Sequence, residues 1–352
     1  MEVNRSFWKG KKVFITGHTG FKGGWLSLWL SDMGAEVYGY SLNPSTESNF
    51  FTVCNLKDHL AGSTIADIRD PIALQQEMLS VFPDIVLHLA AQPLVRYSYA
   101  APVETYAVNV MGTVNLLEAV RQTSSVKAVV IVTTDKCYEN REWLWPYREN
   151  EAMGGFDPYS SSKACSEIIT AAWRRSFLEP AGIHIATARA GNVIGGGDWA
   201  PDRLIPDFLQ SLDARKTLTI RSPHAIRPWQ HVLEPLAGYL LLAESLFDKG
   251  RAFAEAWNFG PEDSDASSVK WIVEYLCSKV PGASWQSDET IQPHEANTLK
   301  LDSSKAKKEL MWQPRWNLPT ALRMTLEWHQ AWREGFDMAS TSLGQIRNYE
   351  AA

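Results

Sequence analysis

A tyrosine and a lysine at helical spacing are the side chains in this sequence best suited to move a proton. Tyr159 and Lys163 lie four residues apart at the start of a predicted helix, so both project from one helix face. An adjacent ammonium group stabilises a phenolate, which lets such a tyrosine accept a proton from a hydroxyl group near neutral pH. The Tyr-x-x-x-Lys pattern is common by chance, but here it follows a predicted strand ending in Thr133 and Thr134. That combination indicates proton exchange with an alcohol.

A glycine-rich turn near the N-terminus is suited to binding a dinucleotide. Gly17, Gly20 and Gly23 directly follow a predicted strand over residues 12–16 and open an apolar helical pattern. Glycines there permit a tight turn and a close approach to a pyrophosphate, whose charge a helix N-terminus favours. The spacing is G-x-x-G-x-x-G rather than the G-x-G-x-x-G of the commonest dehydrogenases.

The adenosine end of the predicted cofactor site has one expected feature and lacks another. Asp67 and Ile68 follow the third predicted strand, where a carboxylate can accept from an adenine amino group, or can simply cap a turn. The second predicted strand, residues 36–40, is followed by Ser41 and Leu42, without the acidic residue that usually binds the adenosine ribose. No arginine suited to a 2′-phosphate lies there either. The pattern favours NAD over NADP, with binding weaker than in proteins that carry the carboxylate.

The elements that must position these residues follow a repeated strand–helix pattern. Continuous apolar runs at 85–90 and 128–133 are typical of parallel strands buried on both faces. Further strands are predicted at 12–16, 36–40 and 184–189, and helices at 102–122 and 159–177. This repetition predicts an α/β fold, a Rossmann-type doubly wound parallel sheet with ligands at the carboxyl ends of its strands.

The pattern changes after about Gly191 to glycine- and proline-rich loops mixed with short helices. We predict an NAD-binding Rossmann domain over residues 1–190, to which a segment at about 229–258 returns. Residues 191–228 and 259–345 are predicted to form a smaller, mixed α/β substrate domain. The C-terminus beyond about Ser340 is expected to be loosely ordered.

Composition excludes several classes of partner. The formal net charge is -6 in 352 residues, which gives no long-range attraction to nucleic acid or anionic membranes. The sequence has no signal-peptide pattern at its N-terminus and no run of about 20 apolar residues. Its four cysteines are scattered without metal-binding spacing, so we expect no metal site, and reduced thiols in a cytoplasmic protein.

Together these features resemble the extended short-chain dehydrogenase/reductase family of nucleotide-sugar enzymes, over nearly the whole chain. The matching pieces are the glycine turn, Asp67-Ile68, the run from His88 to Ala91, Tyr106 to Asn115, Thr133-Thr134, the Tyr159/Lys163 pair, and Leu301 to Ala306. The resemblance implies that Thr134 hydrogen-bonds the reacting hydroxyl, that Tyr159 is the base for hydride transfer, and that Lys163 holds the nicotinamide ribose and lowers the pKa of Tyr159. The residues it implies for NAD binding are Gly17, His18, Gly20, Phe21, Lys22, Gly23, Asp67, Ile68, Ala90, Tyr159 and Lys163.

Asp135 and Lys136, directly after Thr134, separate the subfamilies. Sugar 4-epimerases usually have small residues here, whereas a 4,6-dehydratase needs a general acid to expel the C6 hydroxyl as water. Asp135 stands where the resembled dehydratases carry that acid. Those acting on thymidine-diphosphate glucose follow it with Glu as the C5 base, whereas this chain has Lys136. A desolvated Lys136 beside Lys163 could act as the base through a lowered pKa, or could only support Asp135.

The substrate end is predicted from the resemblance to include several arginines, because guanidinium groups suit bidentate phosphate recognition. Arg227, in the segment Arg227-Pro-Trp-Gln-His-Val232, matches the family's diphosphate-binding arginine, and Asn192 matches a phosphate-binding asparagine. The remaining substrate candidates are Asn109, Arg203 and Arg221. His231 is expected to be structural rather than catalytic.

The combined set of motifs is similar to dehydratases of cytidine-diphosphate glucose, although nothing in the residues themselves indicates cytosine. The resemblance implies a hydro-lyase that uses NAD catalytically to make a 4-keto-6-deoxy sugar, as in the synthesis of lipopolysaccharide O-antigen. A nucleotide-sugar epimerase or reductase is the alternative enzyme, and a non-catalytic dinucleotide sensor is the alternative from another class. The helices at 102–122 and 159–177 resemble those that pair in family homodimers, so a homodimer is expected.

Overall fold

The computed structural model describes residues 2–288 and 298–352, and the part of the predicted substrate domain at 289–297 lies outside this range. Its centre is a seven-stranded sheet of order β11-β6-β5-β4-β1-β2-β3, in which every pairing is parallel. The strands are β1 (Lys12–Thr16), β2 (Glu36–Ser41), β3 (Gly62–Ile65), β4 (Ile85–His88), β5 (Ala128–Val132), β6 (His184–Ala190) and β11 (Ala256–Phe259). The predicted doubly wound Rossmann fold is confirmed.

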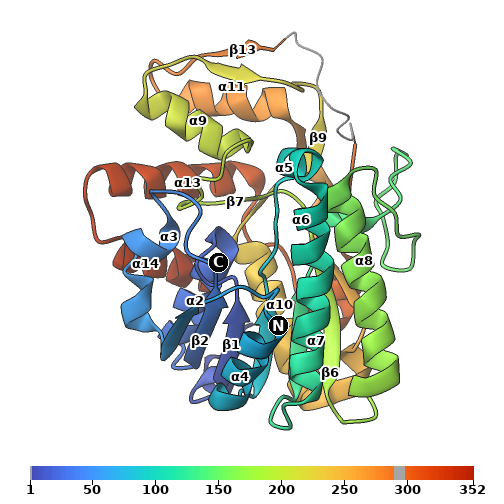
Figure 1. Ribbon diagram of the computed structural model, residues 1–352. Coiled ribbons are helices and arrows are strands. Elements are labelled where there is room, and N and C mark those ends of the chain that lie inside the picture. The colour runs from blue at the N-terminus through green and yellow to red at the C-terminus, as the bar shows by residue number, and fades with distance from the viewer. Residues whose placement is uncertain (1, 289–297) are drawn as a thin grey trace.

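Helices cover both faces of this sheet (Figure 1). One face packs against α4 (Pro71–Val81), α7 (Gly112–Arg121) and the end of α8 (Pro158–Trp173). The opposite face packs against α2 (Phe21–Asp32) and α10 (Leu233–Lys249). Because β4 and β5 are covered on both sides, their side chains are buried without alternation, as their continuous apolar sequences predict.

The predicted helix at 102–122 is present as one continuous helical run with a π-helical turn in its middle. It consists of α6 (Pro102–Tyr106), η2 (Ala107–Met111) and α7. The predicted helix at 159–177 is α8 followed by a second π-helical turn, η4 (Arg174–Leu178). The other short helices that flank the sheet are α1 (Arg5–Trp8), α3 (Phe50–Val53), η1 (Leu56–His59), α5 (Val95–Ala100), η3 (Asp135–Cys137) and η5 (Gly250–Phe253).

A second, smaller region lies above the carboxyl ends of the strands in Figure 1. Its core contains apolar residues of α9 (Leu204–Asp213), α11 (Val269–Lys279) and the start of α13 (Leu318–Arg333). Three two-stranded sheets accompany it, β10-β7, β12-β9 and β13-β8. Their strands are β7 (Val193–Ile194), β8 (Leu218–Ile220), β9 (Ile226–Pro228), β10 (Gln230–His231), β12 (Ala266–Ser268) and β13 (Trp285–Ser287), and η6 (Asp263–Asp265) precedes β12.

The predicted domain boundaries stay a prediction, but the packing shows how the later segments are distributed. The segment at about 229–258 contributes α10 and β11 to the large region. Residues of α12 (Ser304–Glu309) and α14 (Met338–Glu350) also join the large hydrophobic core, through Ala306, Ile346 and Tyr349. Helix α13 contacts both cores, because Leu322 packs with the small region and Trp328 with the large one.

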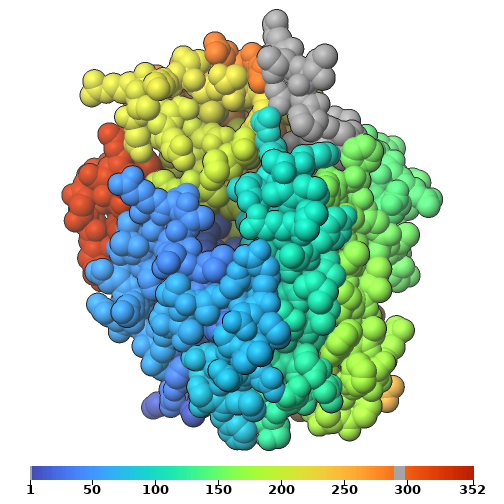
Figure 2. All heavy atoms as spheres, viewed as in Figure 1, coloured from blue at the N-terminus to red at the C-terminus, as the bar shows by residue number. Residues whose placement is uncertain are grey.

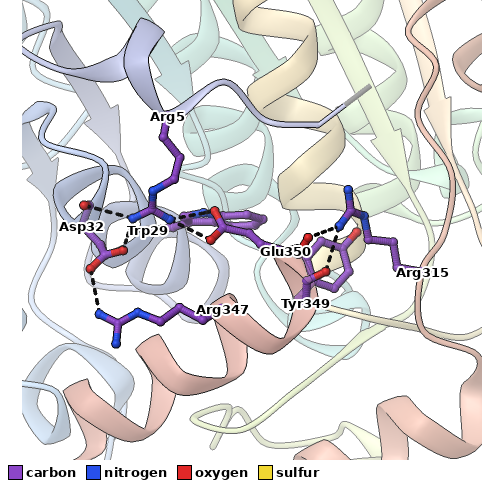
Figure 3. Close-up of polar contacts among 7 residues, drawn as sticks. All are labelled: Arg5, Trp29, Asp32, Arg315, Arg347, Tyr349 and Glu350. Carbon is purple, nitrogen blue, oxygen red and sulfur yellow. Dashed lines mark hydrogen bonds and ion pairs between the residues drawn. The ribbon is translucent and has the colours of Figure 1, made fainter. Parts of the chain in front are cut away.

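The expectation of a loosely ordered C-terminus is wrong, because α14 is held by the N-terminal segment and by α2 (Figure 3). Glu350 accepts from Arg5 Nη1 at 2.7 Å and from Trp29 Nε1 at 2.9 Å. Arg315 Nη1 donates to the Glu350 carbonyl oxygen at 2.6 Å, and Arg5 also pairs with Asp32. The partners come from distant parts of the sequence, which explains why no local signal predicts the helix.

No helix within residues 2–288 and 298–352 combines the length and the apolarity needed to cross a membrane.

Candidate active site

The glycine turn after β1 has the shape that a dinucleotide pyrophosphate requires. Gly17 has φ +80°, and a Cβ there would lie 2.7 Å from the backbone nitrogen of Ala90. A Cβ on Gly23 would lie 2.0 Å from the Gly17 carbonyl oxygen, so the helix can approach the turn only with glycine there. Helix α2 begins after Gly20, which has no side chain to cap the first amides. Those amides can therefore bind an anion, and the turn fits NAD.

The adenosine side of this turn is lined by hydroxyl groups and a histidine, and β2 ends at Ser41 without an acidic residue. Thr19 Oγ1 hydrogen-bonds with Ser41 Oγ at 2.8 Å, and His18 Nε2 with Ser63 Oγ at 2.8 Å. Burial lowers the pKa of His18 to about 4, so the ring is neutral. A hydroxyl-lined edge can donate and accept hydrogen bonds, but it offers the ribose hydroxyls no charged acceptor.

Asp67 lies at the end of β3 as predicted, but its carboxylate already has a partner. Arg69 donates to it through Nε at 2.9 Å and Nη2 at 2.6 Å, which lowers the pKa of Asp67. Ile68 and Ala90 form the neighbouring wall: Ile68 is buried, and the Ala90 amide donates to Thr16 Oγ1 at 3.2 Å. Arg69 was not among the predicted site residues, although its position two residues after Asp67 was an available signal.

Thr134 connects the tyrosine to the aspartate at the end of β5. It caps the short η3 helix, its hydroxyl donates to Asp135 Oδ1 at 3.0 Å, and it also acts on the pKa of the Tyr159 phenol. Tyr159 lies at the start of α8, because Asp157 caps that helix by accepting from the amide of Ser160. Thr134 and Asp135 are therefore joined by a hydrogen bond at the end of β5, and Thr134 also acts on Tyr159.

The prediction that Lys163 lowers the pKa of Tyr159 is not met in this arrangement. Burial raises the pKa of Tyr159 to about 12, and the hydrogen bond with Thr134 opposes that rise. The Lys163 ammonium instead donates to the Val132 carbonyl oxygen at 3.1 Å, and its burial lowers its own pKa to about 8. Desolvation thus favours the neutral forms of both groups.

Asp135 is the most unusual carboxylate of the site. It is 2% exposed, and Oδ2 has no hydrogen-bond partner within the described residues. Burial raises its pKa, against the opposing charges of Lys136, Arg227 and Lys22. A buried carboxyl group that lacks one partner favours its protonated form, which can donate a proton.

Lys22 and Phe21 open helix α2, but they face towards the substrate side of the turn. Phe21 packs on the large core, close to Gly195 of the substrate region. The Lys22 charge interacts with those of Asp135, Arg203 and Lys163, and burial lowers its pKa to about 8. Lys22 was predicted from the glycine motif only as a cofactor residue, and the structure also connects it to the predicted acid.

A buried ion pair, Arg189–Glu167, lies behind these groups and was not predicted from the sequence. Glu167 accepts from Arg189 Nε and Nη2, both at 2.9 Å, and from the hydroxyls of Thr133 and Thr187. Arg189 also donates to the Tyr138 hydroxyl at 2.7 Å. The pair connects α8, β5, β6 and the segment after Asp135. The available sequence signal was the four-residue spacing on α8, which runs from 159 to 163 and on to 167 and places Glu167 on the same helix face as Tyr159 and Lys163.

The predicted substrate residues separate into three groups. Arg227 is buried on β9, and its charge acts on Asp135. Asn192 directly precedes β7, and its backbone carbonyl accepts a hydrogen bond from the Gln230 amide. Arg203 pairs with Asp198 at 2.8 Å, and its charge interacts with that of Tyr159. Arg221 pairs with a different carboxylate, Asp202, at 2.8 Å.

Two further predicted residues lie inside the fold. Asn109 accepts from the Gln92 amide at 2.8 Å and donates to the Gln92 carbonyl and to Ser162 Oγ, so its geometry favours positioning these segments over substrate contact. His231 is fully buried between the rings of Trp25 and Trp316, and burial lowers its pKa to about 3. That environment is consistent with the predicted structural role.

A parallel Rossmann sheet, a glycine turn that fits a dinucleotide, and a Thr–Tyr–Lys group define the class of extended short-chain dehydrogenases/reductases. Residues 14–325 match the family described as GDP-mannose 4,6 dehydratase, and the chain belongs to that family. The sequence-based assignment to the nucleotide-sugar enzymes of this class is confirmed.

Individual relatives agree with this assignment. The chain is 53% identical to a CDP-glucose 4,6-dehydratase of Salmonella typhimurium, with 99% of each chain covered. It is 28% identical to a probable dTDP-glucose 4,6-dehydratase of Sinorhizobium fredii, over 90% of this chain and 92% of that one.

Solved structures share the fold. A UDP-glucose 4-epimerase of Thermotoga maritima with UDP-glucose aligns with TM-score 0.78 and 21% identity, covering 92% of this chain and 99% of that one. A dTDP-glucose 4,6-dehydratase of Bacillus anthracis in complex with NAD aligns with TM-score 0.76 and 21% identity, covering 94% and 100%.

Proposed function

We propose that this protein is a CDP-glucose 4,6-dehydratase, which converts CDP-D-glucose into CDP-4-keto-6-deoxy-D-glucose and water. The observation that carries the proposal is Asp135, a buried carboxyl group with one unpartnered oxygen, whose other oxygen accepts a hydrogen bond from Thr134. An epimerase needs only the base, whereas elimination of water needs this additional acid. The 53% identity to a CDP-glucose 4,6-dehydratase supports both the reaction and the nucleotide.

The side chains divide the proton transfers between them. Bound NAD would supply an acceptor for the C4 hydride and a donor for its return to C6. Tyr159 takes the O4 proton, and Thr134 orients that hydroxyl. The 4-ketone acidifies C5, and Asp135 gives its proton to the C6 hydroxyl as it leaves as water. Lys163 holds the nicotinamide ribose.

Lys136 is our proposal for the group that removes the C5 proton and gives a proton back to C5 when the hydride returns to C6. It directly follows Asp135, is partly buried, and its charge acts on the Asp135 carboxyl group. A Lys136→Met enzyme should then oxidise C4 but fail to exchange the C5 hydrogen with deuterated solvent, as followed by mass spectrometry. Normal exchange in this variant would leave Lys136 with only a supporting role for Asp135.

Substrate and cofactor binding follow the predicted division of the chain. We propose that residues 1–190 with about 229–258 bind NAD, and that 191–228 and 259–345 bind the nucleotide sugar. The proposed NAD contacts are Gly17, His18, Gly20, Phe21, Lys22, Gly23, Asp67, Ile68, Ala90, Tyr159 and Lys163. Arg227, Arg203 and Asn192 are proposed to hold the diphosphate, supported by the closeness of the two arginine charges to Asp135 and Tyr159.

The proposed function is tested with CDP-, dTDP-, GDP- and UDP-hexoses, each incubated with and without added NAD⁺. The alkali-induced absorbance of 4-keto-6-deoxy sugars and the product mass report the reaction. We expect loss of water from CDP-glucose, no accumulation of NADH, and dependence on added NAD⁺, because the ribose site lacks a carboxylate. An epimerised product that keeps its C6 oxygen, or steady NADH consumption, would instead identify an epimerase or a reductase.

We propose that two copies of the chain form a homodimer through the adjacent α6–α7 and α8 helices. Val103 and Ile168 on these helices, and Met111 and Phe177 on the adjoining turns η2 and η4, are exposed and apolar, an unusual face for a monomer. An Ile168→Glu variant should sediment as a monomer, whereas Ile72→Glu, an equally apolar and exposed position on α4, should stay dimeric. A wild-type protein that sediments as a monomer would contradict the proposal.

A cytoplasmic location is proposed as well. It is supported by four cysteines that are all free of disulfides, as reduced compartments favour.

A further inference from the structure

The segments that carry the proposed acid and the start of the substrate region leave the sheet side by side. Strand β5 pairs with β6 so that Val132 lies opposite Ala188, and the Thr133 amide donates to the Ala188 carbonyl oxygen at 2.9 Å. Asp135 and Gly191 each lie three residues beyond this pair. A Cβ on Gly191 would lie 2.9 Å from Asp135 Oδ2. The carboxyl oxygen that has no hydrogen-bond partner within the described residues therefore packs against the Gly191 backbone.

The small region supplies the other side of this contact through Pro228. The same Cβ on Gly191 would lie 2.5 Å from Pro228 Cγ and 3.3 Å from the Pro228 carbonyl oxygen. Pro228 is buried on β9, and the chain just after it is joined to the chain just after Gly191, because the Gln230 amide donates to the Asn192 carbonyl oxygen at 3.1 Å. Figure 2 shows the small region lying directly against the large one. The proposed acid therefore lies where the two regions meet.

The requirement for glycine at position 191 is one of space and not of backbone conformation. Gly191 is not among the glycines with positive φ, so its backbone conformation does not call for glycine. A carbon atom 2.5 Å from Pro228 Cγ and 2.9 Å from Asp135 Oδ2 would overlap both neighbours. An added side chain would therefore displace the Pro228 ring, the Asp135 carboxyl group, or both.

The contact is apolar where it meets Asp135 Oδ2. Pro228 has no amide hydrogen and Gly191 has no side chain, so neither side chain can donate a hydrogen bond to this oxygen. Oδ1 accepts from Thr134, so the proton of the neutral carboxyl group belongs on Oδ2. Because Oδ2 is packed but has no hydrogen bond within the described residues, it can turn towards the C6 hydroxyl without losing one.

The charged groups around Asp135 oppose the effect of its burial. Lys136 on the same turn, Arg227 on β9 and Lys22 on α2 are cations, which favour the ionised carboxylate. Burial nevertheless raises the pKa of Asp135, so desolvation outweighs these three cations. The apolar contact at Oδ2 is part of that desolvation. The other titratable groups that interact with Asp135 are the phenols of Tyr159 on α8 and Tyr239 on α10 and the thiol of Cys137.

We infer that Gly191 and Pro228 are positioning residues for the proposed acid, because together they hold Asp135 Oδ2 in an apolar contact that excludes water. The inference rests on the proposed function, since it concerns the acid that expels the C6 hydroxyl. Gly191 determines where the carboxyl group lies, and Pro228 keeps water away from it. Dehydration therefore depends on this contact, whereas oxidation of C4 at Tyr159 and Thr134 does not.

The first test compares Gly191→Ala with wild type and with a matched control, Gly344→Ala. A Cβ on Gly344, in α14, would meet nothing within 4 Å. The measurements are the dehydration rate with CDP-glucose and saturating NAD⁺, the absorbance of reduced cofactor, and the inhibition constant of CDP. Dehydration by Gly191→Ala should fall about 10- to 100-fold, because the general acid is displaced. Reduced cofactor should accumulate and CDP should inhibit as in wild type, whereas Gly344→Ala should behave as wild type throughout.

The second test uses Pro228→Ala, which removes ring atoms from the contact and admits water to Oδ2. Water access weakens the desolvation, so the three cations lower the pKa of Asp135. Since the acid acts in its protonated form, the dehydration rate should begin to fall at a lower pH than in wild type. A role of Pro228 limited to the stability of β9 would reduce the amount of active enzyme without moving this pH profile.

If Gly191→Ala does not fold, the double variant Gly191→Ala/Pro228→Ala removes the overlap with Cγ and keeps the added carbon beside Asp135 Oδ2. It should show the same loss of dehydration with accumulation of reduced cofactor. Normal dehydration in either variant, equal loss of C4 oxidation and dehydration, or an unmoved pH profile in Pro228→Ala overturns this inference alone. Failure of the wild-type protein to dehydrate CDP-glucose overturns the proposed function and this inference with it.

Discussion

Asp135 and Glu167 are two buried carboxylates next to the end of β5, and their surroundings differ. Glu167 is 6% exposed and accepts from two threonine hydroxyls and two nitrogens of Arg189, which together lower its pKa despite burial. Asp135 is about as buried, but one of its oxygens has no partner within the described residues, and its pKa is raised. A fully hydrogen-bonded carboxylate stays ionised and structural, whereas a partly satisfied one favours the protonated form that an acid catalyst needs.

The largest expected effect comes from Asp135→Asn. An amide keeps the shape and the hydrogen bond to Thr134 but cannot donate the catalytic proton, so the dehydration rate should fall by about 10²- to 10⁴-fold. Oxidation of C4 should continue, seen as the absorbance of reduced cofactor, and thermal stability should change little. If this variant dehydrates CDP-glucose at nearly the normal rate, Asp135 is not the acid.

Glu167→Gln should reduce stability instead of chemistry. The substitution leaves the Arg189 guanidinium buried without its counter-charge, which costs about 3–5 kcal/mol of the free energy of unfolding, measured in urea. The double variant Glu167→Leu/Arg189→Met should recover much of this loss, since it removes both charges. If Glu167→Gln alone is as stable as wild type, Glu167 is not the ionised, structural carboxylate that its contrast with Asp135 requires.

Glu244 on α10 tests an intermediate case. Its Oε1 accepts from the Asn4 amide at 3.0 Å and from Trp8 Nε1 at 2.7 Å, and burial raises its pKa to about 7. The native state therefore keeps a proton that the unfolded chain releases near pH 4.3. This stabilising contribution is complete below that pH and is lost as the pH rises through about 7.

The measurement for Glu244 is the free energy of unfolding of wild type and Glu244→Gln between pH 4 and 8. Relative to wild type, the variant should gain on the order of 3 kcal/mol as the pH rises over this range. A difference between the two proteins that stays constant with pH would mean that Glu244 does not change its ionisation there.

The smallest effect is expected at the exposed end of this series, the ion pairs of Asp32 with Arg5 and Arg347 (Figure 3). Because water and salt screen exposed charges, Asp32→Asn should cost no more than about 1 kcal/mol. The cost should shrink further in high salt, as thermal melts at two ionic strengths would show. A loss as large as that of Glu167→Gln would mean that burial is not what separates these carboxylates.

Much of the fold and part of the site could be predicted because their signals are local. The strands after which Gly17 and Thr134 stand are short apolar runs, and the spacing of Tyr159 and Lys163 places both on one helix face. Arg69 and Glu167 were missed although they lie two and four residues from predicted site residues. In both cases the sequence shows that an oppositely charged partner is possible. It does not show whether the rest of the fold removes water from the pair.

The sequence by itself determined the parallel sheet, the glycine turn and the residues Thr134, Asp135, Tyr159 and Lys163, because strand periodicity, turn chemistry and helical spacing act over a few residues. Only the tertiary structure decided which charges meet and which are buried. It placed Asp202 between Arg96 and Arg221, held α14 through Arg5, and raised the pKa of Tyr159 where local spacing predicted a lower one. The physical reason is that burial and ion pairing depend on contacts between segments far apart in the chain.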